Sequence, residues 1–142
     1  MSSGSAVAIA VTFSWLGMVL AISFLEAPLK FRAPGVTLRI GLGIGRLVFG
    51  ALNVVEVVLA AALVIALVAA PSTSVGVAPA VAVAVLLVQL LLVRPRLSRR
   101  SNAVLTGQAV PRSSAHRVYI GLETIKVIAL LVGGVLLLAA WT

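Results

Sequence analysis

Residues 47–70 read LVFGALNVVEVVLAAALVIALVAA, an apolar run interrupted only by Asn53 and Glu56. A helix needs about 17–25 such residues to cross a hydrocarbon core of about 30 Å. Water cannot satisfy backbone polar groups in that layer, and the run lacks the alternating polarity of a barrel strand, which leaves a helix. The stretch therefore predicts a transmembrane helix and decides the fold class.

Three further apolar runs have a similar length, and they cover residues 6–25, 75–93 and 118–141. With 47–70 they predict an all-α polytopic membrane protein, a single transmembrane domain over residues 1–142 built as a four-transmembrane-helix bundle. The N-terminal residues carry no Lys or Arg, unlike a secretory signal, so we expect the first run to be retained.

The composition agrees with a membrane protein. Of the 142 residues, 62% are hydrophobic and 10% are charged. Soluble domains are about 45–50% apolar and about 25% charged. A soluble fold of this length has too little interior to bury so much apolar surface. These values exclude a soluble enzyme and a disordered chain.

The basic residues predict the topology. Eleven Lys and Arg face three acidic residues, giving a formal net charge of +8. All the cations except Lys126 fall in two segments, 27–46 and 94–117, whereas the termini and residues 71–74 are uncharged. By the positive-inside rule these two loops are predicted to be cytoplasmic and both termini extracytoplasmic. We expect the protein to be integral to the inner cell membrane. Because the arginines lie beside apolar runs, we expect them to set the membrane orientation or to bind anionic lipid headgroups. We expect no nucleic-acid partner.

The charged residues inside the runs are the candidate site. Glu56 lies about 14 Å from the cytoplasmic end of its run, Glu123 about 8 Å and Lys126 about 12 Å, at about 1.5 Å per residue. Charges at such depth cost a few kcal/mol, so we expect them to face the bundle interior and pair. The candidate ligand- or ion-binding residues are Glu56, Asn53, Glu123, Lys126, Glu26 and Gln89.

Lys126 can neutralise Glu56, Glu123 or both. Two carboxylates beside one ammonium leave a formal charge of −1, so this layer can hold a proton or a cation. We expect a transport or small-ligand/ion-binding module; as four helices are few for transport, transport implies an oligomer. The alternative is an accessory or structural subunit of a larger membrane complex, in which the charges only fix helix packing.

An enzyme is the least favoured class. The chain has no cysteine, and we see no nucleophile–base pair or metal cluster, so no catalytic or metal-binding residue is predicted. The sequence identifies no cofactor. The single histidine, His116, would need a second axial ligand from elsewhere to hold haem, and an interfacial polar role is expected instead.

Glycines and prolines indicate close packing and turns. Gly41 and Gly45 have the spacing that lets another helix approach, and Gly133–Gly134 suggest the same. Residues 41–45 do not form a dinucleotide fingerprint, because the required later glycines are absent. Pro28, Pro34 and Gly35 are expected to end the first helix and turn the chain.

Several short motifs follow one another along the chain in a fixed order: Trp15-Leu16-Gly17, Pro28-Leu29-Lys30-Phe31-Arg32, Arg46-Leu47-Val48-Phe49, Arg94-Pro95-Arg96 and His116. In these residues and their order the sequence resembles the four-helix membrane family exemplified by transmembrane protein 205. The resemblance covers most of the chain in topology and only these stretches in residues. The segment before the fourth helix is shorter than in animal members. The resemblance implies the fold more than an activity, and it transfers no functional residue.

Overall fold

Every secondary-structure element in the described part of the chain is a helix. The computed structural model describes residues 3–69, 77–106 and 114–141. The described elements form four continuous helical rods. The first rod comprises α1 (Ser3–Val19), the π-helical η1 (Leu20–Glu26) and α2 (Ala27–Lys30), and the second is α3 (Leu38–Ala69). The third rod comprises α4 (Val77–Val88), the π-helical η3 (Gln89–Val93) and α5 (Arg94–Leu105), and the fourth is α6 (Ser114–Trp141). The all-α prediction is confirmed.

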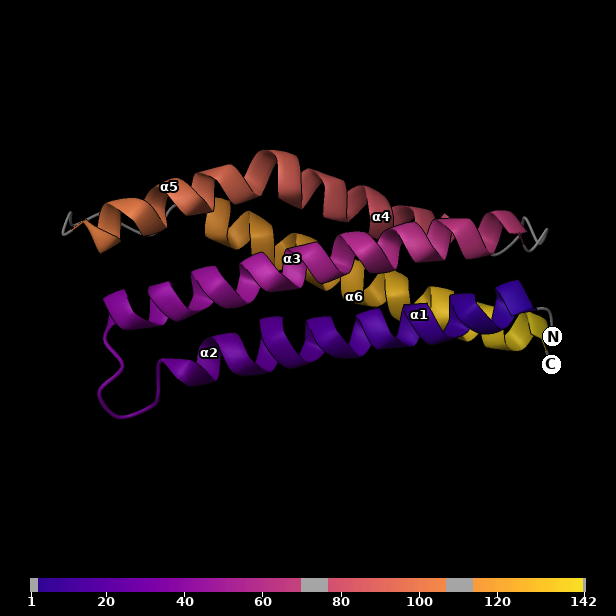
Figure 1. Ribbon diagram of the computed structural model, residues 1–142, viewed down its shortest axis with the longest axis horizontal. Helices are drawn as coiled ribbons and strands as arrows, with labels where there is room; N and C mark the ends of the chain where they lie inside the picture. Colours follow the sequence, from indigo (N-terminus) through magenta and orange to yellow (C-terminus); the bar gives the residue numbers. More distant parts are fainter. Residues whose placement is uncertain (1–2, 70–76, 107–113, 142) are drawn as a thin grey trace.

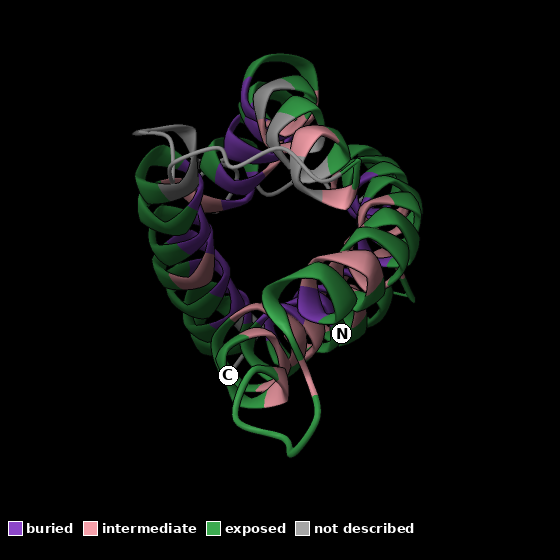
Figure 2. Cartoon of the chain, turned by 90° about the vertical axis from the view of Figure 1, so that its left-hand side faces the viewer, coloured by how far each residue is buried: buried purple, intermediate pink, exposed green. Residues whose placement is uncertain are grey.

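The rods run side by side as an elongated bundle (Figure 1). α1 packs against both α3 and α6, and α6 also packs against α4. The chain termini lie at one end of the bundle, and α2 and α5 lie at the other. Buried residues face the inside of the ring of helices and exposed residues face outward (Figure 2).

The outer surface is apolar, as in a protein surrounded by lipid. Leu47 is 77% exposed, Val68 81% and Leu91 70%. Three helices, Ser3–Lys30, Leu38–Ala69 and Arg117–Ala140, have the length and composition to cross a membrane. The apolar helix Ala78–Val93 is shorter.

The helices extend beyond the apolar runs. α3 begins at Leu38 rather than at residue 47. The segment 37–46, for which the sequence left open an interfacial helix or the start of the second span, therefore supplies the start of this helix. The Thr37 hydroxyl accepts a hydrogen bond from the Ile40 N–H at 3.2 Å, which satisfies one free donor of the first turn. α5 follows η3 without a break. Much of the two segments predicted as loops, 27–46 and 94–117, is therefore helical.

Pro28 does not end the first helix, contrary to expectation: helical structure continues to Lys30. Proline lacks an N–H and clashes with the carbonyl group four residues earlier. For Pro28 and for Pro95 that residue lies in a π-helical segment, η1 and η3 respectively, where the wider turn accommodates the ring. The chain turns only after Lys30, and Gly35 has a φ of 81°, which favours glycine.

Two glycines of α6 permit close helix contacts. A Cβ atom on Gly133 would lie 3.3 Å from Pro79 of α4, and one on Gly134 would lie 2.7 Å from the Phe13 ring of α1. Beside Gly41 and Gly45 the neighbouring atoms belong instead to the side chains of Phe31 and Lys30, where the first rod ends.

Gly134→Ala is expected to destabilise the protein by about 1–3 kcal/mol, because the added methyl group overpacks the α1–α6 contact. Unfolding by SDS in mixed micelles, followed by circular dichroism, measures the change. Gly121→Ala is the matched control on the same helix, since nothing lies within 4 Å of the added Cβ. Equal stabilities of the two variants would contradict this assignment.

Candidate functional site

Four of the six predicted residues meet in the bundle interior. Lys126 Nζ lies 2.5 Å from Glu56 Oε2 and 2.5 Å from Glu123 Oε1. It also donates a hydrogen bond to Gln89 Oε1 at 2.8 Å. All four side chains are buried. Glu56, Gln89, Glu123 and Lys126 form what we call the ion cluster, in which the ammonium group has three acceptors.

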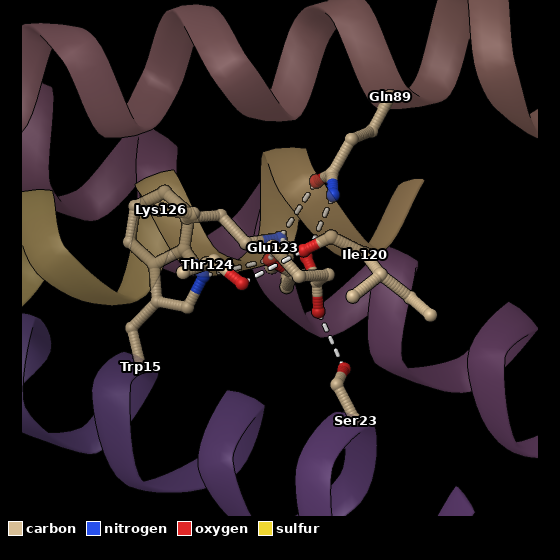
Figure 3. Close-up of polar contacts among 8 residues, drawn as sticks. Trp15, Ser23, Gln89, Ile120, Glu123, Thr124 and Lys126 are labelled. Carbon is tan, nitrogen blue, oxygen red and sulfur yellow. Dashed lines mark hydrogen bonds and ion pairs between the residues drawn. The ribbon is translucent and has the colours of Figure 1, made fainter. Parts of the chain in front are cut away.

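Two further side chains hold the carboxylates from α1 and η1 (Figure 3). Trp15 Nε1 donates to Glu56 Oε2 at 2.8 Å, and Ser23 Oγ donates to Glu123 Oε2 at 2.5 Å. Neither of these two hydrogen bonds was predicted from the sequence. Ser23 carried no distinguishing signal. Trp15 carried one, because a buried indole N–H requires an acceptor and few acceptors exist in these apolar runs.

Glu123 is held from both π-helical segments. Ser23 belongs to η1, and Gln89, whose Nε2 donates to Glu123 Oε1 at 2.8 Å, opens η3. π-Helical turns shift the direction of side chains relative to a regular helix and occur frequently at functional sites.

The structure leaves Asn53 and Glu26 outside the ion cluster. Asn53 is half-buried, whereas Leu52 occupies the inward position one turn before Glu56 and is 2% exposed. A step of four residues along a helix stays nearer the same face than a step of three. Glu26 lies 3.8 Å from Lys30 Nζ at the end of the bundle.

A cavity of about 470 Å³ adjoins the ion cluster. It lies between η1, α2, the first turns of α3, α5 and the start of α6, and both Ser23 and Glu123 contribute to its lining. Phe31, Phe49 and Tyr119 form aromatic parts of its wall. The cluster therefore borders a space large enough for a small ligand.

Three basic side chains also line this cavity: Lys30, Arg46 and Arg94. Lys30 Nζ lies 5.6 Å from the Phe31 and Phe49 ring centroids, and the Arg94 guanidinium lies 5.7 Å from that of Phe49. Burial lowers the pKa of Arg94 from its ordinary value, and the charge of Arg46 acts in the same direction. Positive charge is thus held in a partly desolvated space.

Among the side chains that the structure describes, no three of His, Cys, Asp or Glu lie together so that they could hold a metal ion. The side chain of His116, the residue considered for haem, lies outside the described residues.

Comparison of the chain with protein-family models, curated proteins and solved structures returns no match. The resemblance to the family of transmembrane protein 205 therefore stays an expectation from sequence. The inference of function depends on the geometry of the ion cluster and the cavity.

Proposed function

We propose that this protein is a four-span inner-membrane protein with both termini outside. Three helices of membrane-spanning length, with Ala78–Val93 packed beside them on α6, support four spans. The bundle end that carries α2 and α5 also carries the described basic residues other than Lys126, and the termini lie at the other end (Figure 1). Cytoplasmic placement of the basic end follows the positive-inside rule.

Within that membrane the protein acts as a small-ligand or ion-binding module, of the kind that serves transport. The observation that carries this proposal is that Glu123 belongs both to the ion cluster and to the wall of the cavity. A purely structural ion pair needs no adjoining cavity. A carboxylate shared between them lets a bound ligand or proton act directly on the buried charges.

The charge of the ion cluster supports a proton as the exchangeable species. Glu56, Glu123 and Lys126 carry a formal charge of −1 when both carboxylates are ionised. Glu56 Oε1 is buried and has no hydrogen-bond partner among the described residues. A proton on one carboxylate brings the cluster to neutrality, as a low-dielectric interior favours. We therefore assign a proton as the ion, with Na⁺ or K⁺ as the competing choice.

The alternative function is that of an accessory subunit whose ion cluster only fixes helix packing. The complete coordination of Lys126 favours it, because this side chain is fully buried and all three of its ammonium hydrogens can be donated. The two functions differ in what happens when a cluster carboxylate becomes neutral.

Glu56→Gln and Glu123→Gln are expected to abolish proton flux through reconstituted liposomes while leaving a folded, inserted protein. Flux is driven by a K⁺/valinomycin potential and followed with an internal pH dye, and a Na⁺ gradient provides a second assay. Glu26→Gln is the matched control, since this carboxylate lies outside the ion cluster. If flux is unchanged in both cluster variants and only their stability falls, the ion cluster is a packing element.

A further inference from the structure

We propose that the cavity binds one anionic phospholipid, with the phosphate at Arg46, Arg94 and Lys30 and an acyl chain against the apolar wall. This inference rests on the proposed function and names the ligand class of the same cavity.

The lining carries positive charge that the described residues do not neutralise. Lys30 lies 3.8 Å from Glu26, whereas Arg46 and Arg94 form no ion pair within residues 3–69, 77–106 and 114–141. Arg46 instead donates a hydrogen bond to the neutral amide of Asn102. The other charged group in the wall, Glu123, is already paired with Lys126. Two guanidinium groups are therefore available to an anion, and their planar forks suit phosphate oxygens.

A buried donor is also without a partner at this cavity. Tyr119 lines the cavity and is 7% exposed, and its hydroxyl has no hydrogen-bond partner among the described residues. Leaving a buried hydroxyl unsatisfied is costly, so a ligand oxygen that accepts this hydrogen bond is favoured. The Phe49 ring packs edge-on against Tyr119 at 6.0 Å and helps to fix its orientation.

The cavity wall reaches the apolar outer surface of the bundle. Phe24 is 41% exposed, Phe31 41% and Ile120 46%, and all three contribute to the lining. They lie on η1, the end of the first rod and the start of α6, which separate toward this end of the bundle (Figure 1). In a bilayer these side chains contact lipid, so a phospholipid can enter sideways with its head at the basic end. A soluble anion gains nothing from this apolar wall.

The test is titration of the purified full chain with phosphatidylglycerol or phosphatidylcholine, read by native mass spectrometry. We expect one phosphatidylglycerol per chain, bound at least about tenfold more tightly than phosphatidylcholine. Arg94→Gln or Arg46→Gln should weaken this binding about tenfold, and Tyr119→Phe about fivefold, from the loss of a charged or a neutral hydrogen bond. Arg39→Gln is the matched control, since Arg39 is exposed and outside the lining.

Equal binding of the two lipids, or equal weakening by Arg39→Gln, would overturn the site in favour of general attraction to a basic surface. Displacement of the lipid by glycerol phosphate would overturn the lipid assignment in favour of a soluble anion. Glu123→Gln separates this inference from the proposed function. Lipid binding without Glu123-dependent proton flux supports the inference and contradicts proton transport, whereas such flux without lipid selectivity contradicts the inference alone.

Discussion

Lys126→Met is expected to destabilise the folded protein by at least about 3–5 kcal/mol, the largest effect of any single substitution in the bundle. The ammonium group is fully buried and lies 2.5 Å from a carboxylate oxygen on α3 and 2.5 Å from one on its own helix. Its removal leaves two buried carboxylates without a counter-charge, and the remaining hydrogen bonds from Trp15, Ser23 and Gln89 do not replace it. SDS unfolding in mixed micelles, monitored by circular dichroism, gives the free-energy change.

The matched control is Arg117→Met, which removes an exposed cation from the same helix. Its effect should stay within about 0.5 kcal/mol. Neutralising the partners provides the second test. The triple variant Lys126→Met/Glu56→Gln/Glu123→Gln should regain most of the stability, because replacing a whole buried ion group is far cheaper than removing one member. If the triple variant is no more stable than Lys126→Met, lost packing rather than unpaired charge explains the effect.

Much of the fold was predictable because apolar length is the main constraint on a membrane helix. The run at 47–70 predicts α3 from residue 47 to its end, and the other runs predict α1, α4 and α6. The positions of the helix ends were harder to predict. The sequence left residues 38–46 open between an interfacial helix and the start of the second span, and residues 94–105 open between an amphipathic and an irregular segment; both are helical. A proline such as Pro28 normally signals a helix end. The neighbouring π-helical turns accommodate the proline, and no sequence pattern predicted these turns.

Part of the site was predictable for a similar reason. Charged residues at one depth of a membrane must find one another, which brings Glu56, Glu123 and Lys126 together. The helical stripe was too coarse to separate Asn53 from Leu52, since both lie within one turn of Glu56. The cavity was not predictable at all, because it arises where η1 and α6 separate and where Phe31 and Lys30 fold over Gly41 and Gly45.

Trp15→Ala should cost about 3–5 kcal/mol, the second large effect, because it empties the largest fully buried position in the bundle. The indole contributes volume and a hydrogen bond, and the two can be measured separately. Trp15→Phe keeps most of the ring but removes the Nε1 donor to Glu56 Oε2. That variant should lose about 1.5–3 kcal/mol, the value for a hydrogen bond to a charged group. SDS unfolding of the two variants gives both values.

A double-mutant cycle with Glu56→Gln determines whether the stabilisation by Trp15 depends on the charge of Glu56. The amide of Gln at residue 56 still accepts a hydrogen bond, but it is uncharged. Loss of the Trp15 donor therefore no longer leaves a buried charge without that hydrogen bond. In the Glu56→Gln background, Trp15→Phe should therefore cost less than about 1 kcal/mol. An unchanged cost would mean that Trp15 stabilises the bundle through packing alone. A reduced cost would link α1 directly to the charge state of the ion cluster, so that a proton gained or lost at Glu56 alters the packing of α1 on α3.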